Sequence, residues 1–212
     1  MTNTDITVVI CCAGMGTRLG IGTTKALIQI DGKPLILHQL ELLDDFKDVR
    51  VVVGYQADRV IEVVNSYRKD IMFAFNNDYK TTGPAASLAK GMINSNKYVL
   101  SIDGDVLISP SDFKKLLAYK GGECLAITEK HSSEPILVSI ENQWATQFTH
   151  DGNFEWPGIA KIKSARLKNG EKHIYDIISE LLPIPAIMVQ SRDIDTPEDY
   201  ESAIEWVNNE YK

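Results

Sequence analysis

The chain alternates between continuous apolar runs and amphipathic stretches over its first half. Continuous runs are typical of strands that are covered on both faces. The predicted strands are residues 6–12, 49–55, 71–75 and 97–108. Apolar side chains at helical spacing, with Pro34 and Pro84 at helix starts, predict helices at residues 34–43, 56–69, 84–92 and 110–119. This order predicts a parallel sheet with helices on both faces, which binds ligands beyond the carboxyl ends of its strands.

The pattern changes after residue 120. Shorter strand-like runs, separated by polar turns, predict an antiparallel extension at residues 123–129, 135–140 and 144–150. A final pair of helices is predicted at residues 172–182 and 197–208, and an apolar segment and the loop 191–195 connect them. No repeat or low-complexity linker divides the chain, so we expect one α/β domain.

A glycine-rich turn at residues 13–25 follows the first predicted strand and carries two cations, Arg18 and Lys25. Glycine lets the backbone approach a ligand closely, and successive free N–H groups form an anion cradle, so the turn suits a polyphosphate. The Walker pattern is excluded because Pro34 follows the Gly-Lys pair of the chain. The dinucleotide fingerprint is also excluded, because Leu19 takes the place of its third glycine.

The same turn resembles the signature of nucleotidyltransferases of the sugar-phosphate, phosphocholine and molybdopterin cofactor type. That signature is a G-x-G-[ST]-R turn followed by Pro-Lys or Lys, and the matching residues are Gly14, Gly16, Thr17, Arg18 and Lys25. Thr24 stands where many members carry Pro, and we expect this difference to alter loop stiffness more than chemistry.

The resemblance implies a single-domain, three-layer α/β/α Rossmann-like fold. Its sheet is expected to be mostly parallel, with a small antiparallel extension on the acceptor side. The nucleotide-binding half is expected at about residues 1–120, the acceptor-binding extension at about 121–190, and a metal-ligand loop with a closing helix at 191–212.

Asp103 and Asp105 close the predicted strand at residues 97–108, at the edge where hard divalent cations find oxygen ligands. An Asp-Gly-Asp sequence is also a common strand-ending turn. In the resembled family, the aspartate at the position of Asp105 binds magnesium. We therefore expect Asp105 to be a magnesium ligand, whereas the role of Asp103 stays open.

The second metal ligand of the resembled family precedes the closing helix, and Asp195 takes that place here, with Asp193 beside it. Either Asp195 or Thr196 also suits an N-cap, because Pro197 follows at a first-turn position. The two roles are compatible, since one aspartate can close the helix while another binds the metal.

The resemblance places the nucleotide between the glycine turn and residues 83–87. The residues expected to contact it are Ala13, Gly14, Met15, Gly16, Thr17, Arg18, Lys25, Gly83, Ser87 and Asp103. Gly83 lies at a helix mouth, where free N–H groups and the helix dipole favour anions or acceptors. The Ser87 hydroxyl can bind the edge of a pyrimidine, or it can simply lie in the first helical turn.

The reaction implied by the resemblance is in-line attack of a phosphate or phosphonate oxygen on the α-phosphorus, with release of pyrophosphate. Positioning and charge neutralisation provide most of the catalysis in such reactions. The catalytic residues that we expect are Lys25 on the α-phosphate, Arg18 on the β- and γ-phosphates, and Asp105 with Asp195 on Mg²⁺. A histidine base is not required, because the attacking phosphate is already ionised.

The acceptor pocket is expected around residues 154–163, where the resemblance is loose. Trp156 with Glu155 can receive an aminated head group through a cation–π contact, and Lys161 or Lys163 can bind its phosphate. Ordinary core or cover positions are slightly favoured for Trp144 and Trp156, because large aromatic side chains are usually substantially buried.

Composition limits the partners of the protein. The chain has 212 residues, of which 44% are apolar, so it can build one substantial core. A formal net charge of −7 argues against nonspecific binding to nucleic acids or anionic membranes. The sequence shows no membrane span and no basic secretory signal, and its adjacent Cys11 and Cys12 do not suit a disulfide framework. We therefore expect a cytoplasmic protein, and a homodimer stays open.

The most specific function that these features predict is Mg²⁺-dependent transfer of a nucleotidyl group from CTP to a small acceptor resembling phosphocholine or 2-aminoethylphosphonate. The compact length and the IDGD sequence at residues 102–105 favour a cytidylyltransferase. A sugar 1-phosphate or molybdopterin cofactor nucleotidyltransferase is an alternative. A nonenzymatic nucleotide-binding regulatory domain is another, since fold does not establish function.

Overall fold

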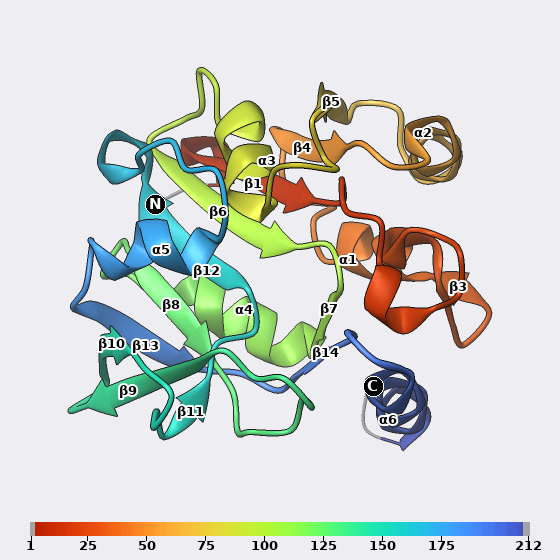
Figure 1. Cartoon of the computed structure of the whole chain (residues 1–212). Coiled ribbons are helices and arrows are strands. Elements are labelled where there is room, and N and C mark those ends of the chain that lie inside the picture. The colour runs from red at the N-terminus through yellow and green to blue at the C-terminus, as the bar shows by residue number, and fades with distance from the viewer. Residues whose placement is uncertain (1–2, 210–212) are drawn as a thin grey trace.

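The computed structural model describes residues 3–209 and contains a ten-stranded sheet that crosses the molecule (Figure 1). Its strands are β1 (Ile6–Cys11), β4 (Val49–Val53), β5 (Met72–Phe75), β6 (Tyr98–Asp103), β8 (Cys124–Ile127), β9 (Leu137–Glu141), β10 (Trp144–Phe148), β11 (Phe154–Glu155), β12 (Ile159–Lys163) and β13 (Ile184–Met188). Two short pairs lie outside it, β2 (Gln29–Ile30) with β3 (Lys33–Pro34) and β7 (Val106–Ile108) with β14 (Ser191–Asp193). The α-helices are α1 (Leu35–Glu41), α2 (Ala57–Tyr67), α3 (Pro84–Gly91), α4 (Pro110–Ala118), α5 (Ile174–Ser179) and α6 (Pro197–Asn209).

The strand order of the large sheet is β11-β9-β10-β13-β8-β12-β6-β1-β4-β5. β1 pairs in parallel with both β4 and β6, and β4 pairs in parallel with β5, as the alternation of strands and helices predicts. Beyond β13, the strands β10, β9 and β11 continue the sheet in antiparallel pairs. The prediction of a single α/β domain with a mostly parallel central sheet and an antiparallel extension is therefore confirmed.

Helices cover both faces of the sheet because its buried strands direct successive side chains into two cores. Val8 and Ile10 of β1 belong to a core formed with α1, α2 and α4. Val9, between them, belongs to the opposite core, formed with α3 and α5. A third cluster packs Trp206 of α6 against Leu19 of the glycine turn. This packing holds the segment before α6 close to the turn (Figure 1).

The second half of the chain differs from the prediction in strand pairing. Residues 159–163, expected in the acceptor pocket, form β12, which pairs antiparallel with β6 and β8 inside the sheet. β8 pairs in parallel with β13, so it belongs to the main sheet rather than to the antiparallel extension. β13 itself lies in a segment that the sequence pattern assigned to a connection. These strands are short and their partners are distant in sequence, so local patterns carry little information about their pairing.

Helix boundaries follow local chemistry. α3 and α4 begin at Pro84 and Pro110, whose fixed φ and missing N–H suit the first helical position. α1 and α5 are shorter than the periodicity predicts and end at Glu41 and Ser179. Within residues 3–209, no helix is long and apolar enough to cross a membrane.

Candidate active site

A cavity of about 360 Å³ lies at the carboxyl edge of β1 and β6. The glycine turn, the start of α3, the loop between β6 and β7, and the segment that precedes α6 all line it. The predicted site residues on its wall are Ala13, Gly14, Gly16, Thr17, Arg18, Lys25, Gly83, Ser87, Asp103, Asp105 and Asp195. The fold thus gathers, around one cavity, segments from the beginning, middle and end of the chain.

The glycine turn presents open backbone N–H groups to this cavity. Gly16 and Gly20 have φ angles of 61° and 71°, and they frame a short 3₁₀ turn at Thr17–Leu19. A Cβ on Gly16 would lie 3.1 Å from Cγ of Lys25, so a larger residue would push against the lysine. The N–H groups of residues 14–18 donate to no acceptor within the part of the chain that the structure describes. They are therefore available to the oxygens of an anionic ligand.

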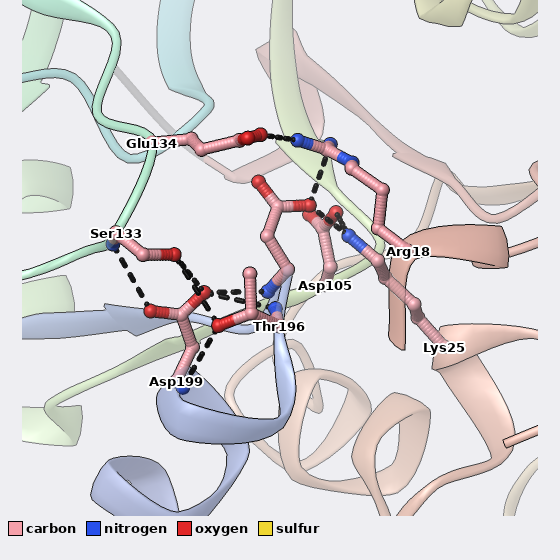
Figure 2. Close-up of polar contacts among 8 residues, drawn as sticks. Arg18, Lys25, Asp105, Ser133, Glu134, Thr196 and Asp199 are labelled. Carbon is pink, nitrogen blue, oxygen red and sulfur yellow. Dashed lines mark hydrogen bonds and ion pairs between the residues drawn. The ribbon is translucent and has the colours of Figure 1, made fainter. Parts of the chain in front are cut away.

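Lys25 connects two distant carboxylates in the cavity. Its Nζ donates to Oδ2 of Asp105 at 2.8 Å and also to Oδ1 of Asp195 (Figure 2). Burial alone would lower the pKa of Lys25, but the charges of Asp105 and then Asp195 outweigh burial and raise this pKa above its ordinary value. Lys25 is therefore a permanently charged ammonium group where the Asp105 loop and the segment before α6 meet.

Arg18 lies beside this cluster and contacts two carboxylates from the second half of the chain. Nη2 donates to Oδ1 of Asp195 at 2.7 Å, and Nη1 pairs with the carboxylate of Glu134 (Figure 2). Burial would lower the pKa of Arg18, but Asp195 and Glu134 outweigh it and raise that pKa. The Arg18 side chain is 55% exposed, whereas that of Lys25 is 13% exposed. Arg18 is thus the more accessible cation for an entering ligand.

Negative charge is concentrated at the floor of the cavity, on Asp103, Asp105, Asp193 and Asp195. Burial, followed by repulsion from Asp105, raises the pKa of both Asp103 and Asp193 well above the ordinary value. Oδ1 of Asp103 is buried and has no hydrogen-bond partner among residues 3–209. Buried carboxylates of this kind are stabilised by additional positive charge.

The donor set suits a divalent cation that also binds substrate. Asp105 and Asp195 direct carboxylate oxygens at the same ammonium group, so they can direct them at a metal ion. Among the described residues, no group of three or more His, Cys, Asp or Glu side chains is arranged to hold a metal. Mg²⁺ characteristically uses one or two protein carboxylates and takes its remaining ligands from water and substrate phosphates. The pair of carboxylates therefore fits Mg²⁺ brought by a nucleotide.

The segment before α6 is fixed by a reciprocal capping arrangement. The N–H of Asp199 donates to Oγ1 of Thr196 at 3.2 Å, and the N–H of Thr196 donates to Oδ2 of Asp199 at 2.9 Å. The N–H of Tyr200 donates to the carbonyl of Thr196, so Thr196 is the N-cap. Asp195 lines the cavity, and the N-cap of this helix is Thr196 rather than Asp195.

The opposite end of the cavity carries neutral polar groups. Ser87 is buried, and its Oγ accepts a hydrogen bond from Nδ2 of Asn76 at 3.0 Å. The same amide nitrogen donates to Oγ1 of Thr82 at 3.1 Å. Because Ser87 accepts from Asn76, its hydroxyl hydrogen is free to donate to a ligand.

The expectation of free N–H groups at the mouth of α3 is wrong for its first residues. The N–H of Gly83 donates to the carbonyl of Glu171 at 2.7 Å, and that of Ala85 donates to Lys172 at 3.2 Å. A Cβ on Gly83 would lie 2.0 Å from the Lys172 oxygen. Glycine is therefore required here by close backbone packing, although Gly83 still lines the cavity.

Five predicted contact residues do not lie on the cavity wall: Met15, Glu155, Trp156, Lys161 and Lys163. Glu155 is 1% exposed and accepts backbone N–H groups of the loop 131–132. Trp156 is buried, and its Nε1 donates to a backbone carbonyl at 3.1 Å. Lys161 is fully buried within β12, and its Nζ contacts the carbonyl of Tyr119 at 3.4 Å. We therefore leave Glu155, Trp156 and Lys161 out of the acceptor site.

Other residues on or beside the cavity were not predicted. Asn76, Tyr79, Ile136 and His173 line it, and Glu134 contacts Arg18 at its mouth. The sequence does indicate a site position for Asn76, because this residue directly follows a predicted strand at the ligand-binding edge of the sheet. Tyr79 and Glu134 lie in polar segments, and Ile136 and His173 lie near the starts of a predicted strand and a predicted helix, where no pattern indicates a ligand contact.

Residues 8–153 match the MobA-like NTP transferase domain. This match covers well over half of the chain. The chain belongs to the MobA-like NTP transferase family. Membership agrees with the resemblance seen in the glycine turn, and it makes the protein a member of a nucleotidyltransferase family.

Two curated relatives resemble the chain in sequence over part of their length. The bifunctional protein GlmU of Ralstonia pickettii (strain 12J) is 32% identical over 131 residues, which are 60% of this chain and 28% of that protein. GlmU of Buchnera aphidicola subsp. Acyrthosiphon pisum (strain Tuc7) is 26% identical over 195 residues, which are 92% of this chain and 39% of that protein. The chain thus spans less than half the length of either relative.

Solved structures share the fold of this NTP transferase at low sequence identity. The inositol-1-phosphate CTP transferase of T. maritima superposes with a TM-score of 0.78 at 16% identity, covering 99% of this chain and 98% of that one. The CTP:phosphocholine cytidylyltransferase LicC of Streptococcus pneumoniae gives 0.75 at 20% identity, covering 96% and 99%. A putative glucose-1-phosphate thymidylyltransferase of Bacillus anthracis gives 0.76 at 18% identity, covering 96% of both chains.

Proposed function

We propose that the protein transfers a cytidylyl group from CTP to a small phosphate or phosphonate acceptor and releases pyrophosphate, with Mg²⁺ as cofactor. The observation that carries this proposal is the position of the Lys25 ammonium between Asp105 and Asp195, beside the open N–H groups of the glycine turn. One location therefore combines a buried cation, two metal-competent carboxylates and an anion cradle. Phosphoryl transfer depends on such positioning and charge neutralisation.

The roles of the cations follow from their burial. Lys25, the buried cation, is placed to neutralise charge that develops on the α-phosphate as the acceptor oxygen attacks. Arg18, the accessible cation, is placed to bind the β- and γ-phosphates and so to orient the leaving pyrophosphate. Asp105 and Asp195 would hold Mg²⁺, which when bound supplies charge neutralisation to the phosphates.

The acceptor needs no protein base, because its phosphate oxygens are ionised near neutral pH. Cys11 and Cys12 line the cavity, but burial raises the pKa of both thiols, so they are neutral and poorly nucleophilic. These observations support direct attack of the acceptor on the nucleotide rather than a covalent enzyme intermediate.

CTP is the proposed nucleotide for two reasons. The donor hydrogen of Ser87, oriented by Asn76, suits the carbonyl oxygen of a pyrimidine. Two structures that share the fold belong to proteins named as a CTP transferase and a CTP:phosphocholine cytidylyltransferase. A transferase that uses a sugar 1-phosphate is the second candidate, because another structure with this fold is named a putative glucose-1-phosphate thymidylyltransferase.

We place the nucleotide in the half formed by residues 1–120 and the acceptor beside residues 121–190, which contribute Ile136 and His173 to the cavity. We also place the protein in the cytoplasm, where nucleoside triphosphates are available.

The proposal is tested by pyrophosphate release in the presence of Mg²⁺. Each of the four ribonucleoside triphosphates is combined with phosphocholine, 2-aminoethylphosphonate or a hexose 1-phosphate. Release with CTP and an amine-bearing acceptor supports the proposal as stated. Release with another triphosphate and a hexose phosphate keeps the reaction type but replaces the substrates. Binding of CTP without release in any combination contradicts the proposed transfer.

A further inference from the structure

A loop from the second half of the chain holds Glu134 at the mouth of the cavity. This loop, residues 131–134, is anchored by two buried carboxylates. Oε2 of Glu155 accepts its first two N–H groups, at 3.0 and 3.3 Å. Asp199 accepts the N–H and the hydroxyl of Ser133, each at 3.1 Å (Figure 2). The backbone next to Glu134 is therefore fixed, and its carboxylate points at Arg18.

The ion pair of Glu134 with Arg18 is the exposed part of the charged cluster. The two side chains are 60% and 55% exposed, whereas Lys25 and Asp195 are 13% and 11% exposed. Among the described residues, Arg18 is the only ion-pair partner of Glu134. Solvent-exposed pairs contribute little to stability, so a ligand can replace this one at small cost.

A triphosphate competes directly for Arg18. Phosphate oxygens bind guanidinium groups through two parallel charge-assisted hydrogen bonds, whereas Glu134 contacts Arg18 through Nη1 alone. Once Arg18 turns to the nucleotide, Glu134 loses its cation but stays at the cavity mouth, because residues 131–133 remain anchored. Ile136, two residues further on, lines the cavity, so Glu134 borders the side that the second half of the chain builds.

We infer that Glu134 binds the positively charged group of the acceptor, in the place where its carboxylate now meets Arg18. This inference rests on the proposed function and names the acceptor class as a phosphate or phosphonate that carries an ammonium group. An acceptor of this class can pair with charged groups at two places in the site. Its phosphate meets Lys25 near the α-phosphate, and its ammonium group meets a carboxylate that would otherwise be unpaired.

The test compares two acceptors of the same shape. Phosphocholine carries a quaternary ammonium group, and 3,3-dimethylbutyl phosphate has carbon in place of that nitrogen. Steady-state rates are measured with CTP and Mg²⁺ for the wild type, for Glu134→Gln, and for the matched control Glu141→Gln, an exposed glutamate on β9. Thermal melting confirms that each variant is folded, and the KM for CTP reports on the nucleotide side.

We expect Glu134→Gln to reduce kcat/KM for phosphocholine by about tenfold, mainly through KM, and to leave the neutral isostere within about twofold. Glu141→Gln should change neither. An equal loss of kcat/KM for both acceptors would show that Glu134 acts only through Arg18. An unchanged ratio of kcat/KM between the two acceptors would remove Glu134 from the acceptor site. Either result overturns the inference but leaves the proposed function intact. No turnover of either acceptor by the wild type, with CTP bound, overturns the proposed function and this inference together.

Discussion

Nζ of Lys25 lies 2.8 Å from Oδ2 of Asp105, although 80 positions separate the two residues in the sequence. The same ammonium group contacts Asp195, 170 positions away. Lys25 therefore neutralises the two carboxylates that would hold a metal ion. A nucleotide can draw Lys25 toward its phosphates and release both carboxylates for the metal it brings.

Lys25→Met should strengthen metal binding in the absence of nucleotide, because it removes a cation that competes for Asp105 and Asp195. We expect the affinity for Mn²⁺, used as a spectroscopic substitute for Mg²⁺, to rise by about tenfold. Electron paramagnetic resonance of free Mn²⁺ measures this directly. Lys33→Met is the matched control, since Lys33 pairs with Glu41 away from the cavity. Equal Mn²⁺ affinity in the wild type, Lys25→Met and Lys33→Met would contradict competition between Lys25 and the metal.

Asp105→Asn and Asp195→Asn should each reduce metal-dependent turnover by on the order of a hundredfold or more, because each removes a charged ligand from a site with only two. The Mg²⁺ concentration for half-maximal rate should rise in both. Asp45→Asn, an exposed aspartate after α1, is the control. A variant with a normal Mg²⁺ requirement would remove its residue from the metal site.

The glycine turn and Asp105 could be predicted from the sequence because they follow strand ends, whereas Asp195 was expected only from the family resemblance. A parallel sheet brings the ends of its strands together, so Lys25 and Asp105 were expected to meet before any contact was known. Glu134 could not be predicted, because its position depends on a loop anchored by Glu155 and Asp199, which are close to it only in the fold.

Asp199→Ala should lower the free energy of unfolding by about 1–2 kcal/mol near neutral pH, because it removes the reciprocal cap on α6 and the anchor of Ser133. Burial would raise the pKa of Asp199, but hydrogen bonds from Ser133 and Thr196 outweigh it and lower this pKa below 3.8. Because its pKa is lower in the folded state, the Asp199 carboxylate stabilises the protein at pH values above its unfolded-state pKa. This stabilisation is lost as the pH falls through the folded-state pKa.

The difference in free energy of unfolding between the wild type and Asp199→Ala, measured in urea, should therefore become smaller in acid. Glu198→Ala, an exposed residue in the same helical turn, should have little effect at any pH. A difference that stays constant down to about pH 3 would show that the Asp199 charge does not contribute.

Asp103 should have the opposite pH dependence. Burial, and then repulsion from Asp105, raises its pKa well above 3.8. The folded protein therefore binds the proton of Asp103 more tightly than the unfolded chain does. As pH rises from the unfolded-state pKa of Asp103 to its raised folded-state pKa, the free energy of unfolding falls. In EDTA, Asp103→Asn should be more stable than the wild type near neutral pH and equally stable in acid. Lower stability of the variant at both pH values, measured by urea unfolding, would contradict this assignment.

The buried positions of Lys161 and Trp156 show what local patterns omit. Both lie in a segment with mixed polar and apolar residues, and only the pairing of β12 with β6 and β8 determines that Lys161 points into the protein. Strand pairing between distant segments is a property of the fold rather than of a short sequence.

The most direct test of the central claim is transfer of label from CTP. CTP labelled at the α-phosphate is incubated with Mg²⁺ and phosphocholine, and the products of the wild type and of Lys25→Ala are separated. We predict labelled CDP-choline and unlabelled pyrophosphate with the wild type, and a rate lower by on the order of a hundredfold or more with folded Lys25→Ala. Equal rates for the two proteins, or label that never reaches the acceptor, would contradict nucleotidyl transfer at the Lys25 site.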